Sequence, residues 1–229
     1  GITSGAHGLP LMGTGDWNDG MNRVGAEGRG ESVWLGWFGG AASREFAYLC
    51  ERAGRADEAA FHRARAEELF AAVEAHGWDG RWYLRAFYDD GHPLGSAAGS
   101  EARIDSIAQS WALLSGAPRS DRTTIALASA VENLVRWEDR LAFLLTPPFE
   151  HTPDDPGYIK GYLPGIRENG GQYTHAAAWL AWAAAEAGDG DTAHRLFDLI
   201  SPVRRTADAD GVARYLAEPY VLAADVYSR

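Results

Sequence analysis

The sequence predicts an all-α protein in which pairs of helices form a toroid with its active site at one mouth. Apolar residues recur at helical spacing in successive segments of the chain. Between these segments lie three long irregular stretches, 1–32, 78–103 and 138–172, which hold much of the Gly and Pro. Loops longer than about 15 residues inside a compact domain are usually functional. We therefore expect the three loops to gather at one end of the helices and carry the site.

The first predicted helices each show one apolar face followed by a glycine. These faces and the glycines that close them are Phe46, Leu49, Cys50 and Ala53 before Gly54; Ala66, Leu69, Phe70 and Val73 before Gly77; and Ile104, Ile107, Ala108 and Trp111 before Gly116. Glycine is common just past a helix C-terminus because it adopts a left-handed backbone without a Cβ clash. The periodicity and the glycines together predict three helices.

The second half of the chain predicts further helices of different character. Residues 121–137 and 193–200 are amphipathic, and 216–228 are expected to form a last helix. The stretch 174–187 consists mostly of alanine and tryptophan and is apolar on every face, which is typical of a helix buried on all sides. Alternation between Arg81 and Asp90 predicts a short β-hairpin within the second loop.

Composition excludes several classes of protein. The net charge of -11 disfavours nucleic acid and anionic lipid, because both are bound through Lys and Arg. No apolar run approaches the roughly 20 residues of a membrane helix, and residues 1–7 do not resemble a signal peptide. Cys50 is the single cysteine, so no internal disulfide forms, and no residue cluster has metal-ligand spacing. We expect a cytoplasmic segment, and anchoring of a longer parent protein in the inner membrane stays open.

The first loop contains two acids around a Trp-Asn pair, Asp16-Trp17-Asn18-Asp19, within a glycine-rich turn. Cleavage of a glycosidic bond needs a protonated carboxyl group beside the leaving oxygen, and an indole can form a wall for the sugar ring. Glycines let the backbone approach a ligand. An ordinary Asx turn, in which the carboxylates bond their own backbone, is the alternative interpretation.

The third loop delivers polar groups to the start of the alanine-rich helix. Its sequence from Arg167 runs Arg-Glu-Asn-Gly-Gly-Gln-Tyr-Thr and ends at His175. A helix N-terminus has free N–H groups and favours anions, so His175 is a candidate phosphate ligand. The alternative is a buried, hydrogen-bonded histidine and a surface ion pair between Arg167 and Glu168.

Together these two loops resemble the signatures of glycoside hydrolase family 94, the inverting carbohydrate phosphorylases. The matching residues are Asp16-Trp17-Asn18-Asp19, Glu168-Asn169-Gly170-Gly171 with His175, and the segment from Ile104 to Trp111. The segments His7–Leu11 and Gly30–Phe38 resemble the branch that contains cyclic β-1,2-glucan synthases and β-1,2-oligoglucan phosphorylases. The resemblance covers essentially the whole chain and implies an (α/α)6 barrel, the toroid of six-hairpin glycosidases.

The resemblance also implies roles for individual residues. Asp19 would be the general acid, Trp17 would pack on the donor glucose, Arg167 and Glu168 would hold sugar hydroxyls, and His175 would contact phosphate. Asp16 would brace the loop. Phosphate would act as co-substrate with no other cofactor, and α-glucose 1-phosphate and a shortened β-glucan would be the products. Asp19 would then need a raised pKa, which we expect from burial and from neighbouring carboxylates such as Asp16.

The family barrel has about twelve helices, and fewer are predicted here. We therefore expect residues 1–229 to be a partial barrel, truncated at both ends, whose missing helices belong to the parent chain. Apolar faces around Trp179 and Trp182 would then be uncovered, and the isolated segment would be inactive and poorly soluble or oligomeric. Control of chain length in cyclic β-1,2-glucan synthesis, a six-hairpin hydrolase with Glu168 as base, a non-catalytic glucan-binding domain and a purely structural helical domain remain alternatives.

Other aromatic and acidic residues are expected to be structural or to line the acceptor side. Trp34 and Trp37 lie three residues apart on a predicted helix and are expected to be core residues. Tyr83, Tyr88, Asp89 and Asp90 are candidates for the acceptor side of the site.

Overall fold

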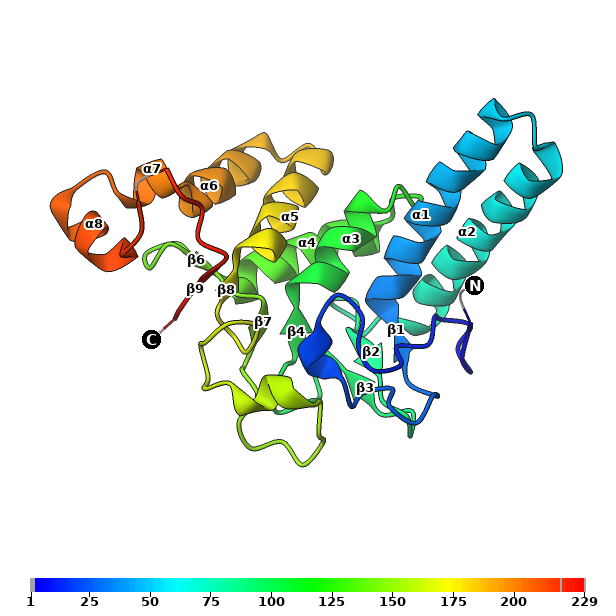
Figure 1. Cartoon of the computed structure of the whole chain (residues 1–229), viewed down its shortest axis with the longest axis horizontal. Helices are drawn as coiled ribbons and strands as arrows, with labels where there is room; N and C mark the ends of the chain where they lie inside the picture. Colours follow the sequence, from blue (N-terminus) through cyan, green and yellow to red (C-terminus); the bar gives the residue numbers. More distant parts are fainter. Residues whose placement is uncertain (1–2, 219, 229) are drawn as a thin grey trace.

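The computed structural model describes residues 3–218 and 220–228 and consists mainly of helices arranged as antiparallel pairs (Figure 1). The pairs are α1 (Val33–Arg52) with α2 (Ala56–His76), α3 (Ser106–Leu114) with α4 (Asp121–Leu134), and α5 (Thr174–Glu186) with α6 (Gly190–Ile200), followed by the short α7 (Pro202–Arg205) and α8 (Ala209–Tyr215). Within the described residues the pairs form an arc that does not close into a ring. The predicted all-α fold is thus present as part of an (α/α)6 toroid.

The first helix of every pair begins on the same side of the molecule. A two-residue strand precedes each of them: β1 (Glu31–Ser32) before α1, β4 (Ile104–Asp105) before α3, and β8 (Gln172–Tyr173) before α5. Helix α3 packs against both α1 and α5. Because α1, α3 and α5 run in the same direction, their N-termini, with their unsatisfied N–H groups, face the loops (Figure 1).

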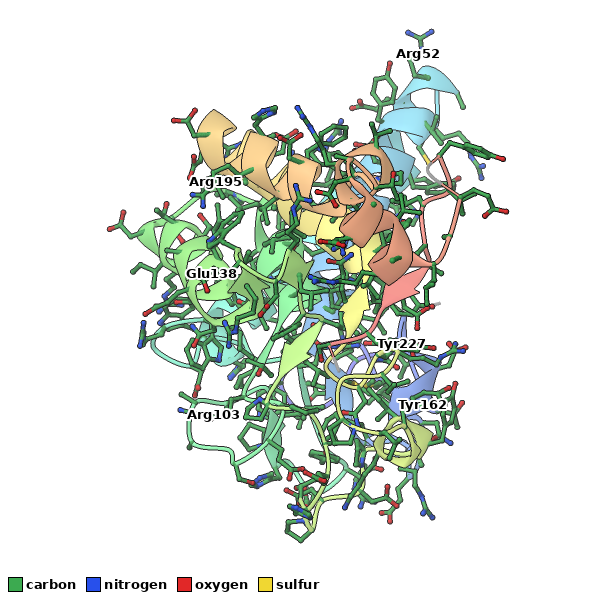
Figure 2. The ribbon with its side chains drawn as sticks, turned by 90° about the vertical axis from the view of Figure 1, so that its left-hand side faces the viewer. Arg52, Arg103, Glu138, Tyr162, Arg195 and Tyr227 are labelled. Atoms are coloured by element: carbon green, nitrogen blue, oxygen red, sulfur yellow. The ribbon has the colours of Figure 1, made fainter. Side chains whose placement is uncertain are left out.

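The loops are joined to the helix starts by short antiparallel ladders. The remaining elements on this side are β2 (Ala86–Phe87), β3 (Pro93–Leu94), β5 (Val135–Arg136), β6 (Leu141–Ala142), β7 (Leu145–Thr146), β9 (Asp225–Val226), and the 3-10 helices η1 (Asp19–Met21) and η2 (Tyr158–Gly161). Strand β2 pairs with β1 and β3, β4 with β7, β5 with β6, and β8 with β9. Figure 2 shows the molecule turned by 90° from Figure 1, with Tyr162 and Tyr227 on the same face.

The predicted hairpin lies slightly further along the chain than expected. Strands β2 and β3 pair in the register Ala86↔Leu94 and Phe87↔Pro93, so the turn contains Asp90 and the second strand lies beyond the predicted range. In addition, Ser32 pairs with Ala86 and fixes this hairpin to the start of α1. The loop around residues 86–94 is thereby held against the helix that carries the first loop.

The apolar face predicted for the first helix was wrong except at Cys50, which is buried. Phe46 and Leu49 are exposed, whereas the buried face of α1 runs through Trp37, Gly40 and Ala47. A Cβ at Gly40 would lie only 2.2 Å from the Phe70 ring, so α2 packs directly on the α1 backbone. Hydrophobic periodicity does not detect such a face because glycine contributes no apolar side chain to it.

Two further expectations about helices need correction, and one is confirmed. Residues 216–228 do not form a helix: α8 ends at Tyr215, Leu216 has a left-handed backbone (φ 56°), β9 follows, and Pro219 lies outside the described residues. Helix α5 is not enclosed on all sides, because Trp182 is 53% exposed, as expected for a face left uncovered by an open arc. Trp34 and Trp37 are core residues, as predicted.

Candidate active site

The first loop is anchored by its own polar side chains. Asn18 caps η1 by accepting a hydrogen bond from the backbone of Gly20 at 3.0 Å. A Cβ at Gly20 would lie 2.9 Å from the Cβ of Ile159, so the loop packs tightly on η2. This arrangement buries Asn18 and leaves Asp19, the first residue of η1, exposed toward solvent.

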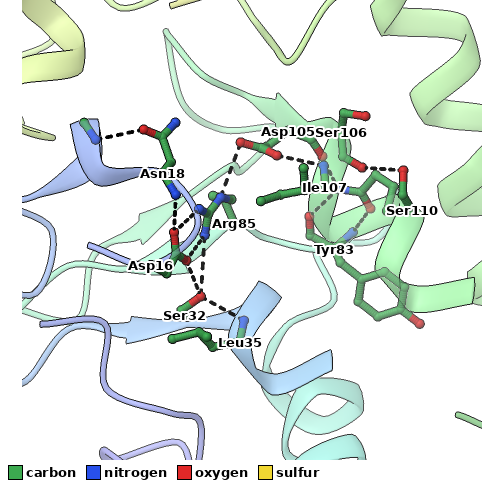
Figure 3. A network of polar contacts seen from close by, with 12 residues as sticks. Asp16, Asn18, Ser32, Leu35, Tyr83, Arg85, Asp105, Ser106, Ile107 and Ser110 are labelled. Atoms are coloured by element: carbon green, nitrogen blue, oxygen red, sulfur yellow. Dashed lines mark hydrogen bonds and ion pairs between the residues drawn. The ribbon is translucent and has the colours of Figure 1, made fainter. Parts of the chain in front are cut away.

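Asp16 points inward and braces the loop. Both of its oxygens accept hydrogen bonds from Arg85 at 2.6 Å, Ser32 donates its hydroxyl at 2.7 Å, and the Asn18 N–H donates at 3.1 Å (Figure 3). Burial would raise the pKa of Asp16, but the Arg85 charge and these hydrogen bonds hold it below the usual value. Asp16 is therefore an ionised structural carboxylate.

Arg85 also contacts a second buried carboxylate, Asp105. Asp105 caps α3 by accepting from the Ile107 N–H at 2.9 Å, and its other oxygen lies 3.4 Å from Arg85 Nε. Burial raises the pKa of Asp105 to about 6, and Arg85 opposes this only in part. One guanidinium thus faces two carboxylates, and as pH falls Asp105, which is not bonded bidentately, takes up a proton before Asp16 does.

Sequence analysis did not identify Arg85. The residue is 1% exposed and lies on the same face of the chain as Tyr83 and Phe87, which are also buried. A charged residue in an alternating apolar segment is a usable signal, because a buried arginine requires a carboxylate partner. The sequence does not reveal that Asp16, 69 residues away, is this partner.

The raised pKa of Asp105 predicts how stability depends on pH. Because the folded-state value lies above the unfolded one, the contribution of Asp105 is full below about pH 4. It is lost as pH rises through about 6. We expect Asp105→Asn, which keeps a capping oxygen, to remove this loss. Chemical denaturation should show the variant gaining on the order of 2–3 kcal/mol over wild type between pH 4.5 and 7.5. A constant difference across this range would contradict the assignment.

The third loop is fixed by Asn169, a fully buried residue. Its side chain accepts from the Phe149 N–H at 2.7 Å and donates to the carbonyls of Phe149 and Tyr162 at 2.9 and 2.8 Å. Gly170 has φ +82°, and a Cβ there would lie 2.9 Å from Pro148. The Asn-Gly pair of the signature is therefore explained by loop structure.

Arg167 is exposed on this loop, and Glu168 beside it is partly buried. Their side chains form an ion pair at 3.4 Å, and the Arg167 guanidinium lies 5.2 Å from the ring centroid of Tyr162. Arg167 itself has a left-handed backbone, with φ 50°, which is unfavourable for a residue with a side chain. The nearby Glu168 charge raises the pKa of Arg167, so the guanidinium stays charged.

The structure brings the two predicted loops together at the start of α5. Trp17 Nε1 donates to His175 Nδ1 at 3.3 Å, although the residues are 158 positions apart. The Trp17 ring centroid also lies 5.6 Å from that of Trp179, and the His175 ring lies 4.1 Å from Trp179. His175 is exposed at the second residue of α5, whose N-terminus has no side-chain cap and no acidic residue in its first turn.

Asp19 and Glu168 lie on the same side of the molecule. Burial raises the pKa of Tyr158 and of Tyr173, and the charges of Asp19 and Glu168 raise both further. Arg167 and Glu168 lie in the loop that leads into α5, and Trp17 and Asp19 lie in the loop that contacts His175 at the start of this helix. The two loops that carry the predicted site residues therefore meet at the N-terminus of α5.

Two expectations about carboxylates and tyrosines were wrong. Asp19 is exposed, and the Asp16 charge is neutralised by Arg85, so neither burial within this chain nor Asp16 provides the expected environment for an acid.

Tyr83 is a core residue that donates its hydroxyl to Glu74 at 2.6 Å. Asp89 accepts three backbone hydrogen bonds from residues 27–30 and fixes that loop rather than lining an acceptor site.

The described residues contain neither a metal-ligand cluster nor a helix that could span a membrane. No group of three or more His, Cys, Asp or Glu side chains is arranged to hold a metal ion among residues 3–218 and 220–228. Over the same part of the chain, no helix combines the length and apolar character needed to cross a bilayer.

An arc of helix pairs with an acid-and-tryptophan loop at its mouth is the framework of a carbohydrate-active catalytic domain. Residues 2–229 match the family model of the Glycosyl hydrolase 94 superfamily, catalytic domain, and the chain belongs to this family. It is 49% identical over 224 residues to "Cyclic beta-(1,2)-glucan synthase NdvB" of Rhizobium meliloti. The matched region is 98% of this chain and 8% of that protein.

Similarity extends to phosphorylases and, in fold alone, to hydrolases. The chain is 39% identical over 83% of its length to "3-O-beta-D-glucopyranosyl-beta-D-glucuronide phosphorylase" of Paenibacillus borealis and covers 24% of that protein. A solved GH63 mannosylglycerate hydrolase from Thermus thermophilus, in complex with glucose, superposes with TM-score 0.53 at 18% identity, over 76% of this chain and 37% of that one. The chain therefore spans well under half the length of these relatives.

Proposed function

We propose that the domain containing this chain catalyses inverting phosphorolysis of β-glucosides, with β-1,2-linked gluco-oligosaccharides as substrates. The observation that carries the proposal is the contact between Trp17 and His175, which joins the Asp-Trp-Asn-Asp loop to a helix N-terminus without a side-chain cap. The relatives named as phosphorylases and as a cyclic β-1,2-glucan synthase support the reaction class and the linkage.

Each residue has a defined role in this proposal. Asp19 protonates the leaving oxygen, and Trp17 packs on the donor glucose. Arg167 and Glu168 bind sugar hydroxyls, and His175, with the N–H groups of α5 that follow Thr174, binds phosphate. Phosphate is already an anionic nucleophile, so it attacks the anomeric carbon from the opposite face without a second carboxylate as base. The products are α-glucose 1-phosphate and a shortened β-glucan.

The exposure of Asp19 indicates what the rest of the site must supply. A general acid that works near neutral pH needs a desolvated environment. In this chain Asp19 faces solvent, so we propose that bound glucan and helices from the remainder of the parent protein cover it. Activity then belongs to the complete domain, and within a synthase the same reaction shortens glucan chains and controls their length.

The proposal is tested by incubating the full-length protein with β-1,2-gluco-oligosaccharides, with and without inorganic phosphate, and assaying glucose 1-phosphate and free glucose. We expect glucose 1-phosphate to form only in the presence of phosphate. Glucan binding without either product would instead indicate a non-catalytic glucan-binding domain.

A hydrolase is the second candidate, because the two loops brought together by Trp17 and His175 each carry a carboxylate, Asp19 in one and Glu168 in the other. An inverting hydrolase needs this pair, one carboxyl group as acid and one carboxylate as base for water. Glu168 would then activate water in place of phosphate. Release of free glucose at a rate independent of phosphate, abolished by Glu168→Gln, would favour this function over phosphorolysis.

A further inference from the structure

Arg85 connects the first loop to the starts of α1 and α3. Its guanidinium bonds both oxygens of Asp16 at 2.6 Å, lies 3.5 Å from the hydroxyl of Ser32 at the start of α1, and lies 3.4 Å from Asp105 at the start of α3 (Figure 3). The three carboxyl and guanidinium side chains are almost completely buried. Such an arrangement joins two helix N-termini and the loop through one side chain.

The backbone of Arg85 is fixed as firmly as its side chain. Its N–H donates to Leu94 at 2.8 Å, and its carbonyl accepts from Val33 at 3.2 Å. A Cβ at Gly95 would lie only 2.5 Å from the Arg85 nitrogen, so the strand beside it packs without space for a side chain. The guanidinium therefore starts from a defined position and can define the positions of its partners.

We propose that Arg85 is a positioning residue that sets the orientation of Asp19 through Asp16, a role that rests on the proposed function. The connection is continuous: Arg85 fixes both Asp16 oxygens, Asp16 accepts from the Asn18 N–H at 3.1 Å, and Asn18 caps the helix η1 that begins with Asp19. The side chains of Arg85, Asp16 and Asn18 are buried, so we expect the effect to be on geometry alone.

The chemistry of the guanidinium explains why arginine is needed here. Its planar fork bonds both oxygens of one carboxylate while the Nε side faces another, whereas a lysine ammonium is a single point charge. Arg85→Lys therefore keeps the positive charge but cannot hold Asp16 bidentately and face Asp105 at the same time. The raised pKa of Asp105 supports this division, because it leaves the guanidinium charge to Asp16.

The first test compares kcat and loop mobility in full-length protein. For Arg85→Lys we expect kcat for glucose 1-phosphate formation to fall about 100-fold, because a displacement of about 1 Å can cost this much. The dissociation constant for β-1,2-gluco-oligosaccharide should change less than threefold. Amide hydrogen exchange in residues 13–22 should become at least about tenfold faster. Leu196→Ala, a buried substitution in α6, controls for lost stability and should leave kcat and this exchange within about twofold of wild type.

A milder pair of variants applies if Arg85→Lys does not fold. Ser32 and Asp189 both cap helices by accepting from a backbone N–H at 3.0 Å, but only Ser32 also bonds Asp16. Ser32→Ala should lower kcat about tenfold and speed exchange in residues 13–22, whereas Asp189→Ala should change neither by more than about twofold, although both lose a cap.

The outcomes separate this inference from the proposed function. Unchanged exchange in residues 13–22 of Arg85→Lys and of Ser32→Ala would overturn the positioning role, whatever the activity. Equal losses of kcat in Ser32→Ala and Asp189→Ala would also overturn it, because the effect would then be loss of stability. If wild-type protein forms no glucose 1-phosphate, the proposed function is ruled out. The hydrogen-exchange measurement still decides whether Arg85 orders residues 13–22.

Discussion

Replacing Asp19 with asparagine is expected to lower kcat for phosphorolysis of β-1,2-gluco-oligosaccharides by roughly 10³-fold. Asparagine keeps the size and the hydrogen-bonding oxygen of the side chain but has no proton to deliver to the leaving oxygen. The exposed side chain at the start of η1 makes no contact on which folding depends, so the melting temperature should stay near that of wild type. Initial rates with saturating phosphate measure the effect.

A substrate with a good leaving group provides the control for Asp19. A nitrophenyl β-glucoside expels a phenolate that needs no protonation, so Asp19→Asn should be much less impaired on it. Asp16→Asn should behave differently: it leaves Arg85 without its bidentate partner and should lose stability on the order of 3 kcal/mol, with no recovery on the activated substrate. An Asp19→Asn variant that retains most of its activity on gluco-oligosaccharides would remove Asp19 from the mechanism.

Replacing His175 with alanine is expected to raise the KM for phosphate about 10- to 100-fold. His175 Nδ1 accepts from Trp17 at 3.3 Å, so in the neutral ring the proton lies on Nε2, where it can be donated to an anion. A hydrogen bond to a charged group contributes about 1.5–3 kcal/mol, which corresponds to this change in affinity. Phosphate titrations at fixed glucan concentration measure it.

Two matched variants show whether the effect of His175 is local. His194→Ala removes an exposed histidine from α6 and should leave the KM for phosphate unchanged. Trp17→Phe removes the N–H that orients His175 but keeps an aromatic ring, so it should raise the KM for phosphate less than His175→Ala does. If His175→Ala changed only the KM for glucan, the phosphate site would have to lie elsewhere.

The sequence predicted the helix pairs well, because their faces are apolar at regular spacing. Leu69, Phe70 and Val73 are buried as their period predicts, and Gly77 ends α2. Two of the helix predictions failed, each for a specific reason. The buried face of α1 includes glycines, which periodicity does not count, and residues 225–226 pair with β8 as β9 instead of belonging to a helix. These structures depend on contacts between segments that are distant in the sequence, so the spacing of apolar residues does not predict them.

The sequence predicted the parts of the candidate site that belong to a motif. It did not predict the parts that depend on long-range contacts. The Asp-Trp-Asn-Asp loop and His175 were found by their residue types, and the structure places Trp17 beside His175. Arg85 was missed, because its partners are brought together only by folding. For the same reason the sequence suggested that Asp16 would act on Asp19, whereas the structure pairs it with Arg85.

The anomeric configuration of the first product tests the central claim most directly. Full-length protein is mixed with β-1,2-gluco-oligosaccharide and phosphate, and proton NMR follows the product as it forms. Asp19 as acid, with phosphate attacking from the side of His175, predicts α-glucose 1-phosphate from the first time point and none without phosphate. β-Glucose 1-phosphate, or free glucose released at the same rate in the absence of phosphate, would contradict the account.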